Sequence, residues 1–108
     1  MATLRILKDC GESFKYQGPR FINLGSNSGE EFRDVYLIPW LNENKTDEIL
    51  EIDFEGTIVY TPSFLEESFG GAIRKGFDVI QNLRFINIPD DKLEKIEDYI
   101  KRALIEKE

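Results

Sequence analysis

The sequence contains no histidine and only one cysteine, Cys10. Without histidine, no Ser-His or Cys-His nucleophile pair can form. One cysteine without histidine also falls short of the usual protein ligands of zinc. A lone cysteine cannot form an internal disulfide, which is typical of a protein kept in a reducing compartment. We therefore expect a cytoplasmic protein that is not an enzyme and needs neither a metal nor another cofactor.

Long apolar runs and a surplus of basic residues are also missing. No apolar run approaches the length needed to span a membrane, and residues 1–9 alternate and soon carry charge, unlike a signal peptide. Lysine and arginine number 14 against 21 acidic residues, which gives a net charge of −7. Because phosphate contacts need clustered basic side chains, this balance disfavours nucleic acid as a partner. We expect neither a nucleic acid nor a membrane to be bound.

The chain has enough apolar material for one core. Its 108 residues are 41% hydrophobic and 12% aromatic, which is typical of a folded globule and too much for a disordered chain. No linker, internal repeat or low-complexity segment interrupts it. We therefore predict a single domain over residues 1–108.

Apolar periodicity predicts an alternation of strands and helices. Four short apolar runs have the length of strands: 3–8, 20–24, 49–54 and 83–88. Three helices are expected to begin at capping boxes, in which Ser or Asp is followed three residues later by Glu: Ser28 with Glu31, Ser63 with Glu66, and Asp91 with Glu94. The order β-β-α-β-α-β-α indicates an α/β domain, a mixed sheet of about four strands covered on one face by three helices, with the first two strands antiparallel.

Several details of the helices can be predicted. Pro39 should kink or break the first helix near Leu37. The pair Gly70-Gly71 could permit close packing of the second helix on the sheet, and Gly76 should end that helix. Residues 77–82 fit either a helical turn or a connection. The last helix has the clearest apolar stripe: Leu93, Ile96, Ile100, Ala103 and Leu104.

The stretch around the third predicted strand resembles a known family. It runs Ile49-Leu-Glu-Ile-Asp-Phe-Glu-Gly and continues as Tyr60-Thr-Pro-Ser-Phe-Leu-Glu-Glu-Ser-Phe-Gly-Gly. Ser28-Gly-Glu-Glu-Phe-Arg precedes it and Leu83-Arg-Phe-Ile-Asn-Ile follows. Over roughly residues 20–90, the chain resembles the STAS-like family of small bacterial domains (the DUF4325 group). More distantly, it is similar to the STAS domains of anti-sigma-factor antagonists. The resemblance implies a STAS-like fold.

The resemblance also implies a place for regulation. In the wider STAS family, a buried strand leads to an Asp-Ser-Ser-Gly-Leu turn, and a kinase of the histidine-kinase-like ATPase fold phosphorylates the turn serine. The nearest match to that serine is Ser63, with Thr61 as the neighbouring hydroxyl. The acidic residue and the glycine of the turn are replaced here, since the segment reads Thr61-Pro62-Ser63-Phe64. The resemblance thus implies a regulatory module that docks a protein partner, such as a histidine-kinase-like ATPase, through Thr61, Ser63 and Phe64. The other interpretation of Ser63 is a helix cap alone.

The loop 25–29 is a second candidate site. Its glycines and hydroxyls precede a helix whose first N–H groups could bind an anion. A nucleotide- or anion-sensing domain would then hold its ligand between the loops 25–29 and 55–62. The candidate residues are Ser26, Ser28, Gly29 and Arg20. The loop lacks the Lys-Ser/Thr ending of a P-loop, and a plain helix cap is the alternative. Arg20 and Arg33 could equally form salt bridges with Glu30, Glu31 or Asp34.

Three further points concern single residues. Asp53, at the end of a buried strand, either has a raised pKa or simply bonds to the following loop. Cys10 is expected to be a small residue near the surface rather than a catalytic thiol. Trp40 and the phenylalanines at 32, 64, 69 and 85 are expected in the core. The last helix could cover the sheet or pair with a second copy, so the oligomeric state stays open.

Overall fold

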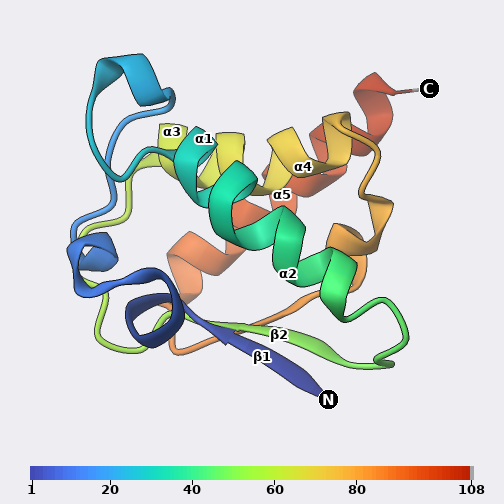
Figure 1. Ribbon diagram of the computed structural model, residues 1–108. Coiled ribbons are helices and arrows are strands. Elements are labelled where there is room, and N and C mark those ends of the chain that lie inside the picture. Colours follow the sequence, from blue (N-terminus) through green and yellow to red (C-terminus); the bar gives the residue numbers. More distant parts are fainter. Residues whose placement is uncertain (108) are drawn as a thin grey trace.

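The computed structural model describes residues 1–107 and shows three parallel strands beneath a layer of helices (Figure 1). The strands are β1 (Ala2–Arg5), β2 (Leu50–Asp53) and β3 (Arg84–Ile86), in the spatial order β1-β2-β3. Leu4 lies opposite Ile52, which in turn lies opposite Phe85. Since the helices all lie on one face of this sheet (Figure 1), side chains at alternate positions of each strand point into the core or toward the polar outer face.

Helical connections join the parallel strands. Between β1 and β2 the chain forms α1 (Gly29–Glu31), a π-helical turn (Phe32–Leu37) and α2 (Ile38–Glu43). Between β2 and β3 it forms α3 (Pro62–Leu65), a π-helical turn (Glu66–Gly70) and α4 (Gly71–Arg74). Helix α5 (Asp90–Glu106) follows β3. Shorter turns are a π-helical one at Ile6–Cys10 and 3₁₀ turns at Glu12–Lys15, Ile22–Leu24 and Asp78–Asn82.

The prediction of a mixed sheet of about four strands was wrong in the described residues, because residues 20–24 form no strand. The carbonyls of Pro19 and Arg20 accept hydrogen bonds from the N–H groups of Gly29 and Glu30, at 2.9 and 3.0 Å. These are the first open N–H groups of helix α1. The carbonyls of residues 19 and 20 therefore bond to the start of a helix and not to a neighbouring strand. The first strand is also shorter than predicted, because the chain turns into the π-helical turn at Ile6.

The helix ends agree only in part with the sequence. The first helix continues through Pro39 without the predicted break, and its hydrogen-bond pattern changes from π to α between Leu37 and Ile38. Gly76 ends the second helix as predicted: at φ +100° its N–H donates to Ile73, while the next N–H donates to Ala72. The predicted cap at Asp91 is wrong, because Pro89 holds the cap position, two residues earlier, and α5 begins at Asp90.

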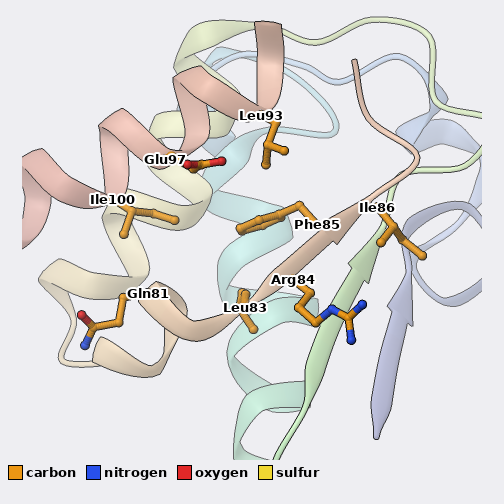
Figure 2. A pocket seen from close by; sticks show the side chains of 8 residues that line it. All are labelled: Gln81, Leu83, Arg84, Phe85, Ile86, Leu93, Glu97 and Ile100. Atoms are coloured by element: carbon orange, nitrogen blue, oxygen red, sulfur yellow. The ribbon is translucent and has the colours of Figure 1, made fainter. Parts of the chain in front are cut away.

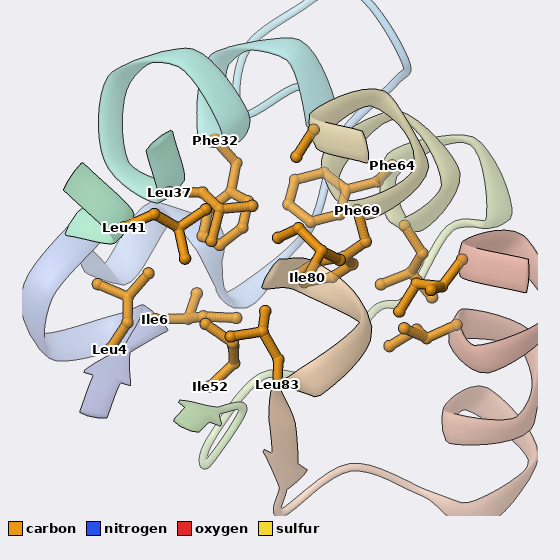
Figure 3. Close-up of a cluster of buried hydrophobic side chains, with 14 of the residues drawn as sticks. Leu4, Ile6, Phe32, Leu37, Leu41, Ile52, Phe64, Phe69, Ile80 and Leu83 are labelled. Atoms are coloured by element: carbon orange, nitrogen blue, oxygen red, sulfur yellow. The ribbon is translucent and has the colours of Figure 1, made fainter. Parts of the chain in front are cut away.

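The core lies between the sheet and the helices (Figure 3). Leu4 and Ile52 contribute from the strands, and Phe32, Phe64 and Phe69 from the first two long helices. The apolar stripe of α5 joins it as predicted, with Ile96, Ile100 and Ala103 buried. The predicted core aromatics lie there too, Phe85 and Trp40 partly exposed.

Candidate functional site at the Thr61 helix start

The connection from β2 to α3 is held by side chains near its own ends. Asp53 Oδ1 accepts hydrogen bonds from the Glu55 N–H and from the Asn87 side-chain amide, both at 2.8 Å. The Thr57 hydroxyl donates to the Phe54 carbonyl at 2.7 Å. Asp53 therefore has the second of its two expected roles, bonding to the following loop. These bonds fix the start of the loop that leads to α3.

Thr61, and not Ser63, caps the helix. The Phe64 N–H donates to Thr61 Oγ1 at 3.3 Å, and the same hydroxyl donates to the Gly18 carbonyl at 2.8 Å. Pro62 occupies the first helical position, where its missing N–H costs nothing. The predicted capping box at Ser63 is therefore wrong: the cap lies two residues earlier, and Phe64 stands where a capping box would have a carboxylate. The half-buried Ser63 lies in the first turn, and its hydroxyl has no hydrogen-bond partner in residues 1–107.

The Phe64 side chain points into the core and not toward the surface where a partner protein could bind. Its side chain is fully buried and its ring packs 5.6 Å from the ring of Phe32 and 6.3 Å from that of Phe14. Of the two roles expected for Phe64, packing in the core and docking a partner, the structure shows the first and contradicts the second. In this conformation, a partner can contact Thr61, Pro62 and Ser63 but not the Phe64 ring.

An apolar surface that the sequence did not reveal lies next to this helix start. Tyr16, Ile58 and Val59, here called the Tyr16 patch, have 59%, 55% and 39% of their surfaces exposed. Tyr16 and Val59 face each other in an isolated parallel bridge, and the Ile58 N–H donates to the Lys15 carbonyl at 2.9 Å. Because residues 15–16 are remote in sequence from 58–59, no local motif could have found this patch.

Gln17 lies beside the patch and joins the two predicted loops. Its N–H donates to the Val59 carbonyl at 3.4 Å, and the next N–H, of Gly18, donates to the Asn27 carbonyl at 2.9 Å. The loops 25–29 and 55–62 are thus neighbours, as the anion-site hypothesis requires. However, the backbone of residues 17–18 bonds to both. The Gln17 side-chain amide is buried and has no hydrogen-bond partner in the described part of the chain.

Three of the four residues predicted for the anion site already bond within the fold: Ser28, Gly29 and Arg20. Ser28 caps α1, as predicted: its hydroxyl accepts from the Glu31 N–H at 3.0 Å, while Glu31 accepts from the Asn27 N–H at 3.2 Å. Ser28 and Gly29 are buried, and Ser26 is exposed. A side-chain carbon added at Gly29 would come within 2.6 Å of the Phe64 carbonyl oxygen, so this glycine permits the close approach of two helices.

Arg20 belongs to an ion-pair cluster around Glu66 and Glu67. Its Nη1 lies 2.6 Å from Glu66 and 3.1 Å from Glu67. Arg74 also contacts both, at 2.8 and 3.7 Å. Hydrogen bonds from Arg74 and Arg20 lower the pKa of Glu66 despite its partial burial. The arginine predicted for anion binding is thus a salt-bridge partner, of carboxylates that lie far away in sequence.

Arg33 is the buried member of this cluster. Its guanidinium contacts the Glu67 carboxylate, and its Nε lies 2.8 Å from Asp34, the pairing that the sequence left open. Burial opposes the charge of Arg33 most strongly, but bonds to Asp34 and Glu67 together raise its pKa. The Arg33 hydrogen bond lowers the pKa of Asp34. Gly71 would place an added carbon 2.6 Å from Arg33 Nη1, so this glycine makes room for the ion pairs rather than for packing on the sheet.

Three further possibilities concern the Cys10 thiol, a metal site and a membrane-spanning helix. Cys10 is buried instead of lying near the surface, and burial, helped by Asp9, raises the pKa of its thiol to about 12. Residues 1–107 contain no cluster of three His, Cys, Asp or Glu side chains arranged to hold a metal ion. Within the same residues, no helix has the length and apolar character needed to cross a membrane.

Comparison with known proteins supports the resemblance noted above. The family model described as a STAS-like domain of unknown function (DUF4325) matches residues 28–93. That segment extends from the cap of α1 into the first turn of α5 and includes β2, the Thr61 helix and β3. No curated protein and no solved structure matches. Since the matched segment covers more than half of the chain, the protein belongs to the family of STAS-like domains of unknown function.

Proposed function

We propose that this STAS-like protein is a cytoplasmic, non-enzymatic regulatory module that docks a protein partner at the Thr61 helix start. The observation that carries the proposal is the exposed Tyr16 patch beside Thr61–Ser63. Three large, exposed apolar side chains on two segments whose backbones are bonded to each other offer contact area at little cost in conformational entropy. An aromatic residue with aliphatic neighbours is a common composition for the centre of a protein interface.

The docking surface includes the Tyr16 patch, Thr61, Pro62 and Ser63, and omits the buried Phe64. The family resemblance suggests an ATPase of the histidine-kinase-like fold as the partner. The Ser63 hydroxyl, which has no bond to any of residues 1–107, supports regulation at this surface, because capping is performed by Thr61. Phosphate added at Ser63 would place negative charge at the positive end of the helix and directly beside the patch.

Paired variants test the docking surface. Ile58→Asp should abolish binding to a co-purifying partner, because it places a charge within the apolar patch. Val35→Asp is the matched control, since Val35 is 53% exposed on the first helix and lies outside the patch. The partner is first captured with the wild-type protein, identified, purified and tested directly. Equal binding by both variants would refute the proposal.

Regulation at Ser63 has a separate test. Phosphopeptide mass spectrometry of the protein from its native cells should find phosphate on Ser63. Ser63→Asp should weaken partner binding, and Ser63→Ala should leave it intact. Persistent absence of phosphate would remove the modification and leave the docking surface standing.

The anion-sensing alternative gains less support from the geometry. Ser28 is used as a cap, and Arg20 is bonded to two carboxylates. An anion would have to displace these internal partners before it could bind.

A further inference from the structure

A groove runs along the outer edge of β3 (Figure 2), and no residue of the Tyr16 patch lines it. It has a volume of about 510 Å³ and lies between β3 and α5. Leu83 and Phe85 line it from the strand side, and Leu93, Glu97 and Ile100 line it from α5. In Figure 2 the Phe85 ring points toward α5, and Leu93 and Ile100 lie on the facing wall.

The strand side of this groove has open backbone groups. Among residues 1–107, β3 pairs only with β2, so its other edge has no strand neighbour there. The Ile86 carbonyl accepts from the Phe54 N–H at 3.0 Å and therefore faces the β2 side. Because backbone groups of successive strand residues point to opposite edges, the N–H and C=O of Phe85 face away from β2. A second strand is the partner that these groups fit.

The charges beside the groove indicate the chemistry of that strand. Arg84 is exposed, points away from α5 in Figure 2, and has no ion-pair partner among residues 1–107. Glu97 lies on the opposite wall, between Leu93 and Ile100. A strand added here would place one row of side chains next to Arg84 and the alternate row against Phe85 and α5. Acidic residues suit the first row. Apolar residues suit the second, where Glu97 would repel another carboxylate.

We propose that the groove between β3 and α5 binds an extended peptide segment of a protein partner as a fourth strand, with apolar side chains facing α5 and acidic side chains facing Arg84. This is strand addition to a sheet edge, in which main-chain bonds supply affinity and alternate side chains supply specificity. The proposal concerns a second surface and does not depend on docking at the Tyr16 patch.

The test uses a synthetic probe, an acetylated and amidated seven-residue peptide of alternating valine and aspartate. Titration into the ¹⁵N-labelled protein should shift the amide signals of residues 83–87, and hydrogen exchange at Phe85 N–H should slow. Two N-methylated probes separate main-chain from side-chain binding, one methylated at every valine amide and the other at every aspartate amide. Only one of them should lose binding, because alternate amides face β3. Equal binding by both, or no shift at residues 83–87, would overturn the proposal.

Charge reversal tests the acidic row. Arg84→Glu should lower the affinity for the aspartate probe about three- to fivefold, the size expected for one exposed ion pair. It should raise the affinity for a probe with lysine in place of aspartate. Arg5→Glu is the matched control, because Arg5 is an exposed arginine on the opposite edge strand. If Arg5→Glu had the same effect, general electrostatics would explain the binding and the specific row would be refuted. A doubled mass in light scattering with Phe85 N–H protected before any probe is added would show pairing of two copies instead.

Discussion

The buried contact between Arg33 and Glu67 should couple the first two long helices strongly. The two side chains have only 6% and 11% of their surfaces exposed. Removing one partner of a fully buried ion pair costs about 3–5 kcal/mol, because the other charge is left without compensation. Here Glu67 keeps Arg20 and Arg74, and Arg33 keeps Asp34. We therefore expect Arg33→Met and Glu67→Met each to lower the free energy of unfolding by about 2–3 kcal/mol, somewhat below that range.

The double variant should cost about 3 kcal/mol and not the sum, because each single change already removes the shared contact. Urea unfolding followed by circular dichroism measures this. With a slope of about 1.2 kcal/mol per molar urea, each single variant should lower the midpoint by about 2 M. Arg102→Met is the control, since its ion pair with Asp98 is largely exposed and should contribute less than about 0.5 kcal/mol. Additive effects within about 0.5 kcal/mol, or single costs below about 1 kcal/mol, would refute the reasoning.

Three further predictions concern stability. Thr61→Ala should cost about 1–2 kcal/mol of unfolding free energy by removing the cap and its bond to a distant carbonyl, whereas Ser63→Ala should change it by less than about 0.5 kcal/mol, both measured in urea. Hydrogen bonds from Arg74 and Arg20 lower the pKa of Glu66 in the folded state from its ordinary value of 4.5, so the stability that Glu66 contributes is complete above that pH and declines as the pH falls through the lower folded value. Glu66→Gln should therefore flatten the loss of melting temperature between about pH 5 and 3. Gly29→Ala should lower the free energy of unfolding by about 3 kcal/mol, because the added carbon meets rigid backbone at 2.6 Å. Gly71→Ala should lower it less, because the nearest neighbour of its added carbon is the movable end of an arginine side chain. Equal melting temperatures of the two variants would contradict this.

Local patterns in the sequence predicted the elements that depend on local chemistry. The strands predicted from the apolar runs 49–54 and 83–88 are confirmed as β2 and β3, and the apolar stripe of α5 is confirmed too. The Ser28 cap and the helix end at Gly76 are also confirmed. In each case the residues that decide the structure lie within a few positions of one another, or lie on one apolar face that packs into the core.

The misses have a common physical origin in long-range partners. Residues 20–24 have the composition of a strand, but the carbonyls at 19 and 20 serve a helix start nine or ten residues later. Thr61 outcompetes Ser63 as the cap partly because Gly18, far away in sequence, accepts its hydroxyl. Arg20 pairs with Glu66 across 46 residues, and the Tyr16 patch needs a bridge between residues 16 and 59. Sequence spacing cannot show such partners.

The parallel sheet has a consequence for how the chain must fold. Each strand pair joins distant residues: β1 contacts β2 across 48 positions, and Asp53 contacts Asn87 across 34. The described chain therefore contains no hairpin that could form early as an independent unit, and every strand contact has to close a long loop first. During synthesis, β1 remains without its neighbour until β2 has left the ribosome, and β2 keeps one open edge until β3 follows. For that interval, Leu50 and Ile52 depend on β1 and the first helix to shield them from other chains.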